Sequence, residues 1–241
     1  IPTSLARLEP SPSQRPAEPL GQLHLKAFRS QLSEPLEPER RQEVGSLSLY
    51  SPLVYAPQAA AIAFGRALGC SALALLYLGR LANLAAWALL SALAIRIAPA
   101  RGWAFALLFL TPMAVFQAAS LSADNPTNAI ALLFVASCLR AAFAPAAAFE
   151  RREAGAIIAA GLALGLAKPG YWALGALVLL IPGRRFDTSA RRWQYSAAVL
   201  AAVLLPSIFW QLSVDAAQPY TLTLEANPRA QLEGILSAPF A

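Results

Sequence analysis

The sequence predicts an all-α fold, a polytopic bundle of about six transmembrane helices with an interfacial helix beside it, and three observations support this. Hydrophobic residues make up 57% of the chain and charged residues 13%, with a mean hydropathy of +0.51, whereas soluble domains are about half apolar and about a quarter charged. The charges are segregated, because residues 1–45 hold twelve of the thirty-two and Gly102–Leu139 holds one, Asp124. Long apolar runs also alternate with short arginine-bearing segments.

The net charge is +6, from seventeen Arg and two Lys against thirteen acids. Such a surplus suggests a nucleic-acid or an anionic-lipid partner. Most arginines from residue 96 onward lie in the short segments between apolar runs, which is the pattern of membrane orientation, so we expect membrane lipid as a partner and no nucleic acid. Cys70 and Cys138 fall at opposite membrane faces, too far apart for a disulfide, and we interpret them as small apolar fillers.

Residues 1–50 are predicted to form an extracytoplasmic loop that is partly disordered. Residues 1–45 hold seven of the nineteen prolines and many Glu and Gln, so this stretch cannot form a packed core by itself. His24 lies in a short amphipathic run, Leu23–Leu32, and with no second His or Cys nearby we expect a solvated side chain rather than a metal ligand. The chain starts at Ile1 with no targeting helix, so we interpret it as a piece of a longer protein.

Residues 51–69 are predicted to form an interfacial helix. The segment is apolar but is interrupted by Pro52 and Pro57, and it carries Arg66 near its end. The dozen residues Gln58–Gly69 would reach about 18 Å as a helix, which is too short for a hydrocarbon core of about 30 Å. A helix that lies at the membrane surface or re-enters it fits this length.

Residues 70–214 are predicted to form the transmembrane bundle, followed by an extracytoplasmic tail or loop over 215–241. A further apolar stretch, Ala154–Ile181, is broken by Lys168-Pro169-Gly170 and flanked on both sides by arginines, so the positive-inside rule favours a hairpin of two short helices with Lys168 at the outer surface. The same rule places the short arginine-bearing loops in the cytoplasm and Ser120–Thr127 outside. Four apolar runs can each span the membrane: Ala72–Ile97, Trp103–Ala119, Asn128–Phe143 and Trp193–Leu212.

Polar side chains within the apolar runs are candidate functional residues, because a charged group costs about 2.5–3.5 kcal/mol to place at the centre of a membrane helix. Arg80 and Asn83 share one helix face and either bind a substrate or join neighbouring helices. Asp124 is the only acid between residues 44 and 149. It is either a helix cap ahead of Pro126 or, with Gln117 and the nearby serines, part of a polar outer mouth.

Lys168 stands where two shortened helices are predicted to meet, and interrupted apolar segments are where membrane proteins tend to build cavities. Its ammonium could hold a phosphate or extend to lipid headgroups. The sequence contains no glycine-rich phosphate loop, no paired His or Cys with metal-ligand spacing, and no nucleophile elbow. The motifs of soluble enzymes are therefore absent, and no metal ligand set is predicted.

Five segments carry a family resemblance: YSPLVYAPQ, YLGRLANL, AIRIAP, TPMAVFQAASLSADNPTNA and GLAKPGY, in this order. They resemble the bacterial predicted-membrane-protein family called domain of unknown function 2142 over about Ile1–Val214, and S-x-S-A-D-x-x-x-N is the most specific part. More distantly, the layout is similar to membrane glycosyltransferases of the GT-C superfamily, such as the aminoarabinose and protein mannosyltransferases. In those proteins an outer loop ends in a Pro-Leu-x-Tyr interfacial helix, an Arg follows in the next helix, and an Asp follows the third; Pro52–Tyr55, Arg80 and Asp124 occupy those places here.

The resemblance implies a multi-pass protein of the bacterial inner membrane that moves a sugar from a polyprenyl-phosphate donor to an extracytoplasmic acceptor. Lys168 or Arg80 would counter the donor phosphate, and Asp124 would orient the acceptor or a divalent ion. With the polar residues above, the candidate substrate-binding set is Tyr55, Arg80, Asn83, Gln117 and Lys168, and Asp124 has a supporting catalytic role. GT-C enzymes also carry an acidic general base in the first outer loop, and that motif is missing here. The N-terminal acids do not occur in a matching context: Glu9, Glu18, Glu34, Glu37, Glu39 and Glu43.

Two other interpretations stay open. A transporter or flippase of lipid-linked glycans would also place basic groups at a cavity, although such proteins usually contain internal repeats and no convincing repeat occurs in this sequence. A non-catalytic membrane scaffold would use its polar residues only to join helices, and it predicts that Asp124→Asn leaves activity intact.

Overall fold

The computed structural model describes residues 32, 50–99, 102–143, 149–217 and 237, and every regular element within them is a helix. This confirms the all-α prediction. The expectations for the N-terminal loop with His24, and for most of the tail, lie outside the described residues. The elements that define the bundle are η3 (Pro52–Tyr55), α3 (Ala56–Ala67), α4 (Ala72–Ile97), α5 (Gly102–Phe109), α6 (Pro112–Ala118), α7 (Asp124–Phe143), α8 (Arg151–Ala167), η4 (Tyr171–Leu180), η5 (Gly183–Arg185) and α9 (Ser189–Ala217).

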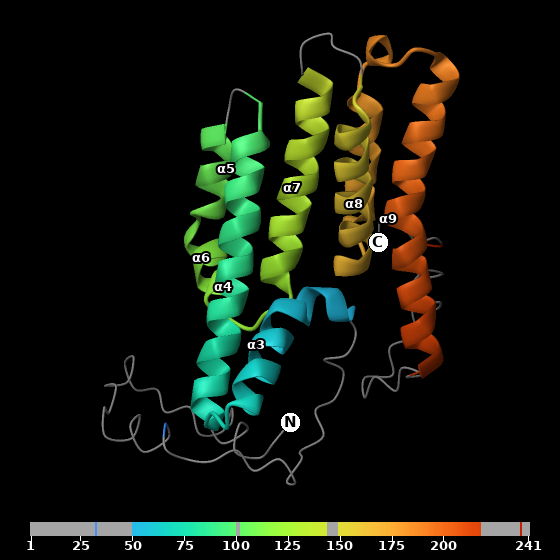
Figure 1. The fold of residues 1–241 in the computed structure, drawn as a ribbon. Coiled ribbons are helices and arrows are strands. Elements are labelled where there is room, and N and C mark those ends of the chain that lie inside the picture. Colours follow the sequence, from blue (N-terminus) through green and yellow to red (C-terminus); the bar gives the residue numbers. More distant parts are fainter. Residues whose placement is uncertain (1–31, 33–49, 100–101, 144–148, 218–236, 238–241) are drawn as a thin grey trace.

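The helices α4, α7, α8 and α9 stand side by side in a row, and each contacts the next (Figure 1). The short helices α5 and α6 pack on α4, while α3 and η3 cross one end of the bundle. We call this end, where α7 begins and α8 turns into η4, the Asp124 end. The opposite end, where α8 begins and η5 lies, is called the arginine end. Asp124 and Lys168 therefore lie at the same end of the bundle, as the predicted hairpin and membrane orientation require.

Three described helical segments are long and apolar enough to cross a membrane: Ala72–Ile97, Asp124–Phe143 and Ser189–Val214. They correspond to three of the spans predicted from the sequence. The remaining described helices are shorter or less apolar, so the count of six spans stays a prediction. A row of lipid-length helices joined by shorter ones is the scaffold on which the polar groups lie.

The predicted single helix over Trp103–Ala119 is wrong, because the chain forms two short helices, α5 and α6, with a break at Leu110 and Thr111. Pro112 has no backbone N–H, and its ring would clash with the carbonyl four residues earlier in a continuous helix. The Thr111 hydroxyl instead donates a hydrogen bond to the Leu108 carbonyl at 3.1 Å. Pro112 then starts α6 at a position where a helix needs no donor.

The predicted hairpin at Lys168-Pro169-Gly170 is confirmed. The helix α8 ends at Ala167, and Gly170 adopts a left-handed φ of 97°, which glycine tolerates without strain. The returning segment η4 is a 3₁₀ helix of 10 residues. Its steeper rise lets it reach about 20 Å back along α8, where an α-helix of the same length would reach about 15 Å.

Glycines on α8 allow this hairpin to pack closely on α9. Gly161 and Gly165 are one helical turn apart, and a Cβ placed on Gly165 would lie 2.2 Å from the Val203 carbonyl oxygen. Small residues at this spacing let membrane helices approach to backbone contact. Gly175 of η4 faces Leu200 and Val203 of the same helix. Both arms of the hairpin therefore rest on α9, which fixes the position of Lys168 at its tip.

The expected helix over residues 51–69 is present as η3 followed by α3. The Ser51 hydroxyl accepts a hydrogen bond from Leu53 N at 3.2 Å and so starts η3. At the other end Gly69 has a positive φ of 70°, and the Ser71 hydroxyl accepts from Ala74 N at 3.3 Å to begin α4. The two helices α3 and α4 thus form a tight hairpin, and η3 comes to lie over the start of α7.

Arg185 at the arginine end is a buried residue that links neighbouring helices. Its side chain is 4% exposed and forms an ion pair with Glu153 of α8, with Nη2 at 3.0 Å from Oε2. Its Nη1 donates to the Ala141 carbonyl at 2.6 Å, in the last turn of α7, where helix carbonyls lack partners. The guanidinium also lies 5.3 Å from the ring centroid of Phe149. One residue of the arginine cluster thus joins α7, α8 and η5.

Candidate functional site

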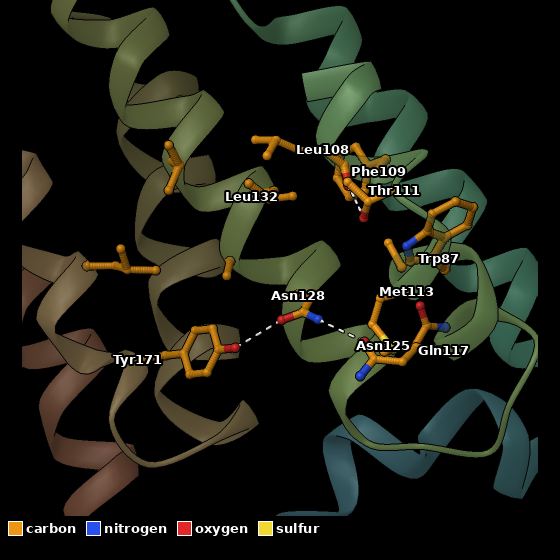
Figure 2. Close-up of a pocket in the computed structure, with 14 residues that line it drawn as sticks. Trp87, Leu108, Phe109, Thr111, Met113, Gln117, Asn125, Asn128, Leu132 and Tyr171 are labelled. Atoms are coloured by element: carbon orange, nitrogen blue, oxygen red, sulfur yellow. Dashed lines mark hydrogen bonds between the residues drawn. The ribbon is translucent and has the colours of Figure 1, made fainter. Parts of the chain in front are cut away.

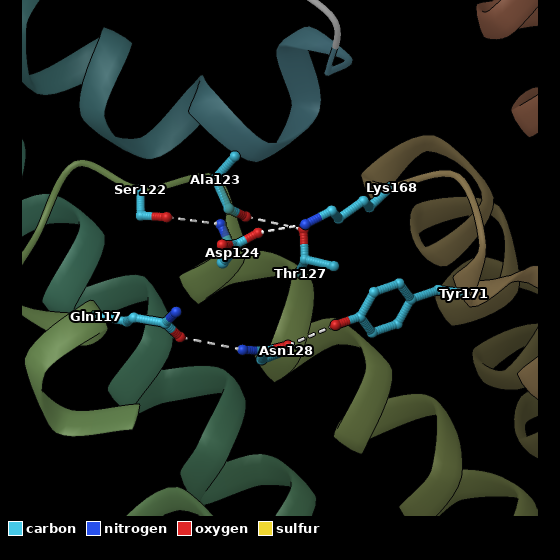
Figure 3. A network of polar contacts seen from close by, with 8 residues as sticks. All are labelled: Gln117, Ser122, Ala123, Asp124, Thr127, Asn128, Lys168 and Tyr171. Atoms are coloured by element: carbon cyan, nitrogen blue, oxygen red, sulfur yellow. Dashed lines mark hydrogen bonds and ion pairs between the residues drawn. The ribbon is translucent and has the colours of Figure 1, made fainter. Parts of the chain in front are cut away.

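Asp124 and Lys168 form an ion pair at the Asp124 end, with Lys168 Nζ donating to Asp124 Oδ1 at 2.8 Å (Figure 3). The two residues are 44 positions apart in the chain, and the side chains are 38% and 30% exposed, respectively. The sequence placed both residues on the same side of the membrane, and the structure brings them into direct contact at one end of the bundle. The contact ties the start of α7 to the tip of the α8–η4 hairpin.

Among the described residues, the Asp124 carboxylate accepts from Lys168 and from no backbone N–H at the start of α7, so the structure does not support the interpretation of Asp124 as a helix cap. The Ser122 hydroxyl accepts a hydrogen bond from Asp124 N at 3.1 Å, and the Thr127 hydroxyl donates to the Ala123 carbonyl at 2.8 Å. Ser120 likewise turns onto the backbone and donates to the Gln117 carbonyl at 2.7 Å. Because these short side chains satisfy the turn, the Asp124 carboxylate is left to face Lys168.

Asn83 supports this turn from behind. Its side chain is 0% exposed, and Nδ2 donates to the carbonyls of Ser120 at 2.8 Å and Ser122 at 3.4 Å. Asn125 Nδ2 in turn donates to the Asn83 carbonyl at 3.3 Å. Asn83 therefore positions the backbone that leads into Asp124, which is the helix-joining role that the sequence left open.

Arg80 lies one turn from Asn83 on α4 and is the other candidate, besides Lys168, for the cation of the site. Its guanidinium carbon is 5.8 Å from the ring centroid of Tyr77, and its Nε is buried with no hydrogen-bond partner. Among the described residues, no hydrogen bond or ion pair joins Arg80 to Asp124. Lys168 is therefore the cation of the site.

A second row of polar contacts lies one helical turn further along α7. Asn128 Nδ2 donates to Gln117 Oε1 at 3.3 Å, and the Tyr171 hydroxyl donates to Asn128 Oδ1 at 2.9 Å (Figure 3). Asn128 follows Asp124 by four residues and so shares its helix face. Neither Asn128 nor Tyr171 was singled out from the sequence, although Asn128 ends the S-x-S-A-D-x-x-x-N segment. Its spacing from Asp124 was the signal that could have identified it.

Two cavities flank the beginning of α7. One, of about 370 Å³, lies against η3 and is lined by Asp124 together with Tyr50, Tyr55 and the Leu121–Ala123 turn. The other, of about 400 Å³, lies between α4, α5, α6, α7 and η4, and Gln117 and Asn128 line it (Figure 2). The two cavities share no lining residue among those described. We call them the charged pocket and the neutral cavity.

The surroundings of the charged pocket keep Lys168 protonated. The hydrogen bond with Asp124 raises the pKa of the Lys168 ammonium, while burial acts in the opposite direction. The ammonium lies 5.2 Å from the ring centroid of Tyr50, within the range of a cation–π contact. Burial, then Tyr50 and Asp124, raise the pKa of the Tyr55 hydroxyl. The Tyr55 hydroxyl thus remains a neutral donor beside one cation and one carboxylate.

This arrangement can bind an anion and orient a hydroxyl group. An ammonium has three N–H donors and Asp124 takes one of them, so Lys168 can also donate to a phosphate oxygen. The second carboxylate oxygen of Asp124 can accept a hydrogen bond from a ligand. No three His, Cys, Asp or Glu side chains meet within the described part of the chain, so the divalent ion suggested by the resemblance has no protein ligand set there.

Comparison with known proteins gives one result. Residues 16–241 match the predicted membrane protein family DUF2142, and this range includes Asp124 and Lys168. No curated protein and no solved structure matches the chain. The match covers far more than half of the sequence and agrees with the three lipid-length helices. The chain therefore belongs to the predicted membrane protein family DUF2142.

Proposed function

We propose that this protein is a membrane glycosyltransferase of the GT-C kind, in which the charged pocket binds the phosphate and sugar of a polyprenyl-phosphate donor. The observation that carries the proposal is the 2.8 Å contact between Asp124 and Lys168 beside a cavity of about 370 Å³. A carboxylate and two tyrosines line this cavity, and a cation pairs with that carboxylate; these are groups that such a substrate requires.

Lys168 would bind the donor phosphate. Its ammonium is partly buried at the tip of a hairpin that close glycine contacts fix on α9, so little side-chain or backbone ordering is needed when an anion binds. Charge pairing is also stronger in a partly desolvated site than in open water. Tyr50 and Tyr55 would offer aromatic faces and hydroxyl groups to the sugar, because a tyrosine presents an apolar body and a polar tip.

Asp124 would orient the acceptor hydroxyl or the sugar rather than act alone as the base. One of its oxygens is held by Lys168, and its backbone N–H is held by Ser122, so the free oxygen has a fixed direction. A hydroxyl held in a fixed direction reacts faster because its orientation is set before the reaction. Asn128, one turn further on, would extend this polar face toward Tyr171.

The test is sugar transfer by the purified full-length protein in lipid, with polyprenyl-phosphate sugars as donors. We expect Asp124→Asn and Lys168→Ala each to lower transfer by at least roughly tenfold, since each removes a charge-assisted contact worth about 1.5–3 kcal/mol. The matched controls are Asp187→Asn and Arg191→Ala, which break an exposed ion pair at the arginine end. Transfer that is unchanged in both Asp124 and Lys168 variants would remove the site assignment.

A flippase of lipid-linked glycans is the second candidate, favoured by the broken helices at the site. The α5–α6 break and the α8–η4 hairpin both flank the polar residues, and discontinuous helices frame substrate sites in many transporters. The two functions separate in proteoliposomes that contain a labelled polyprenyl-phosphate sugar but no acceptor. Movement of label across the bilayer that Lys168→Ala abolishes would favour the flippase, and a sugar transfer that needs an added acceptor would favour the transferase.

A further inference from the structure

The neutral cavity has a polar end and an apolar end. Figure 2 shows Asn128, Gln117 and Tyr171 gathered on one side, whereas Leu108 and Leu132 lie on the other. The remaining described walls are mostly apolar. At about 400 Å³ the cavity lies in the range of ligand-binding pockets, about 300–1,000 Å³. A ligand that fills it must therefore combine a short polar group with hydrocarbon.

No charged side chain occurs among the described residues that line this cavity. An ionised ligand group would enter it without a counter-charge, and burying an unpaired charge is very costly. The charged pocket, which has Asp124 and neighbouring Lys168, is a separate space with different walls. The ligand of the neutral cavity is therefore expected to be uncharged.

A buried oxygen at the polar end lacks a hydrogen-bond partner. Asn125 is 1% exposed, and its Oδ1 has no partner although its Nδ2 donates to the Asn83 carbonyl. An unsatisfied buried acceptor costs about 1–3 kcal/mol. Beside it, Gln117 accepts from Asn128 through Oε1, so its amide N–H groups remain for another acceptor. One hydroxyl group can donate to Asn125 and accept from Gln117.

The wall formed by the α5–α6 break faces outward. Leu108 and Met113 line the cavity and are also 53% and 65% exposed, and Thr111 lies between them. Exposed apolar side chains on a protein whose helices are long enough to cross a membrane are suited to contact with lipid tails. We propose that the neutral cavity binds an uncharged membrane amphiphile, a hydrocarbon chain that ends in a hydroxyl group, which enters past the α5–α6 break. This binding does not depend on sugar transfer.

The experiment is photolabelling of the whole protein in lipid nanodiscs with a long-chain primary alcohol that carries a diazirine on its chain. We expect labels on α5, α6, α7 or η4 at the walls of the cavity, located by mass spectrometry. Unlabelled alcohol should compete, its methyl ether should compete roughly tenfold less well because it cannot donate to Asn125, and its monophosphate should also compete poorly. Equal competition by alcohol and ether, or labels spread over the outer helix faces, would overturn the proposal.

Two neighbouring substitutions on α6 give a matched pair. Ala114→Phe fills the cavity, because Ala114 lines it, whereas Val115→Phe adds the same ring on an exposed position that does not line it. We expect the first to reduce labelling at least roughly tenfold, because the ring occupies the ligand's space and so removes all of its contacts, of which the one hydrogen bond already accounts for this factor, and the second to leave it unchanged. Equal labelling in the two variants would contradict the site, and if Ala114→Phe fails to fold, the competition series on the wild-type protein still decides.

Discussion

Gly165 on α8 is the position with the least room for a side chain, and Gly165→Ala tests how the Lys168 hairpin is held. The added Cβ would lie 2.2 Å from the Val203 carbonyl oxygen and 2.9 Å from its carbonyl carbon. Real Cβ contacts stay above 3.0 Å, so the oxygen contact must lengthen by about 0.8 Å. Because the opposing atoms are backbone, α8 and α9 themselves must separate. Overpacking costs about 1–3 kcal/mol, against the roughly 0.5–1 kcal/mol that alanine gains over glycine within a helix.

The control is Gly155→Ala on the same helix, where an added Cβ would meet nothing within 4 Å. The assay is thermal or denaturant unfolding of both variants in the same detergent or nanodisc. We expect Gly155→Ala to be as stable as the wild type or slightly more so, and Gly165→Ala to be less stable by about 1–2 kcal/mol. Equal stability of the two variants would refute the backbone contact between α8 and α9 and the argument that this contact fixes Lys168.

Two further predictions concern the arginine end and the orientation. Arg185→Gln should lower the free energy of unfolding by about 3 kcal/mol, because it leaves the Glu153 carboxylate unpaired in a largely buried site. The control is Arg184→Gln, at an exposed position, which should change the free energy of unfolding by less than about 0.5 kcal/mol. Denaturant unfolding of both variants measures these changes. Cys70 lies at the Asp124 end and is partly exposed, while Cys138 is buried. A membrane-impermeant maleimide added outside intact cells should therefore label Cys70 and not Cys138, and labelling of Cys70 only after the cells are opened would reverse the predicted orientation.

Local signals in the sequence predicted the parts of the fold that depend on neighbouring residues. Proline and glycine in Lys168-Pro169-Gly170 marked the break in the apolar stretch, and the arginines on both sides of the stretch made the hairpin predictable. The position of arginines at one end of the chain's apolar runs then fixed the parity that brings Asp124 and Lys168 together. The predicted topology gave these residues a shared side, but it did not predict their ion pair across 44 residues, for which the sequence holds no direct signal.

The features that the sequence did not predict depend on packing between distant segments. Proline is tolerated inside membrane helices, so Pro112 alone did not indicate whether the helix bends or breaks. In the structure the helix breaks between α5 and α6, and the Thr111 hydroxyl donates a hydrogen bond to the Leu108 carbonyl at this break. Arg185 looked like its neighbours in a basic cluster, and only the placement of α7 and α8 gives it a buried carboxylate. The Asn128–Tyr171 bond likewise joins two segments 43 residues apart.

The ion pair at the site affects substrate binding and turnover in different ways. Without a ligand, Lys168 and Asp124 neutralise each other, which avoids an unpaired charge in a partly buried place. A phosphate that binds Lys168 must share the ammonium with the carboxylate, and the two negative groups repel each other. In the transfer assay, Asp124→Asn is therefore expected to lower kcat while the KM for the donor stays equal or falls. Lys168→Ala is expected to raise the KM, because it removes the group that attracts the phosphate. If Asp124→Asn instead raised the KM for the donor with kcat unchanged, Asp124 would only bind the donor, and its role in orienting a reacting group would be wrong.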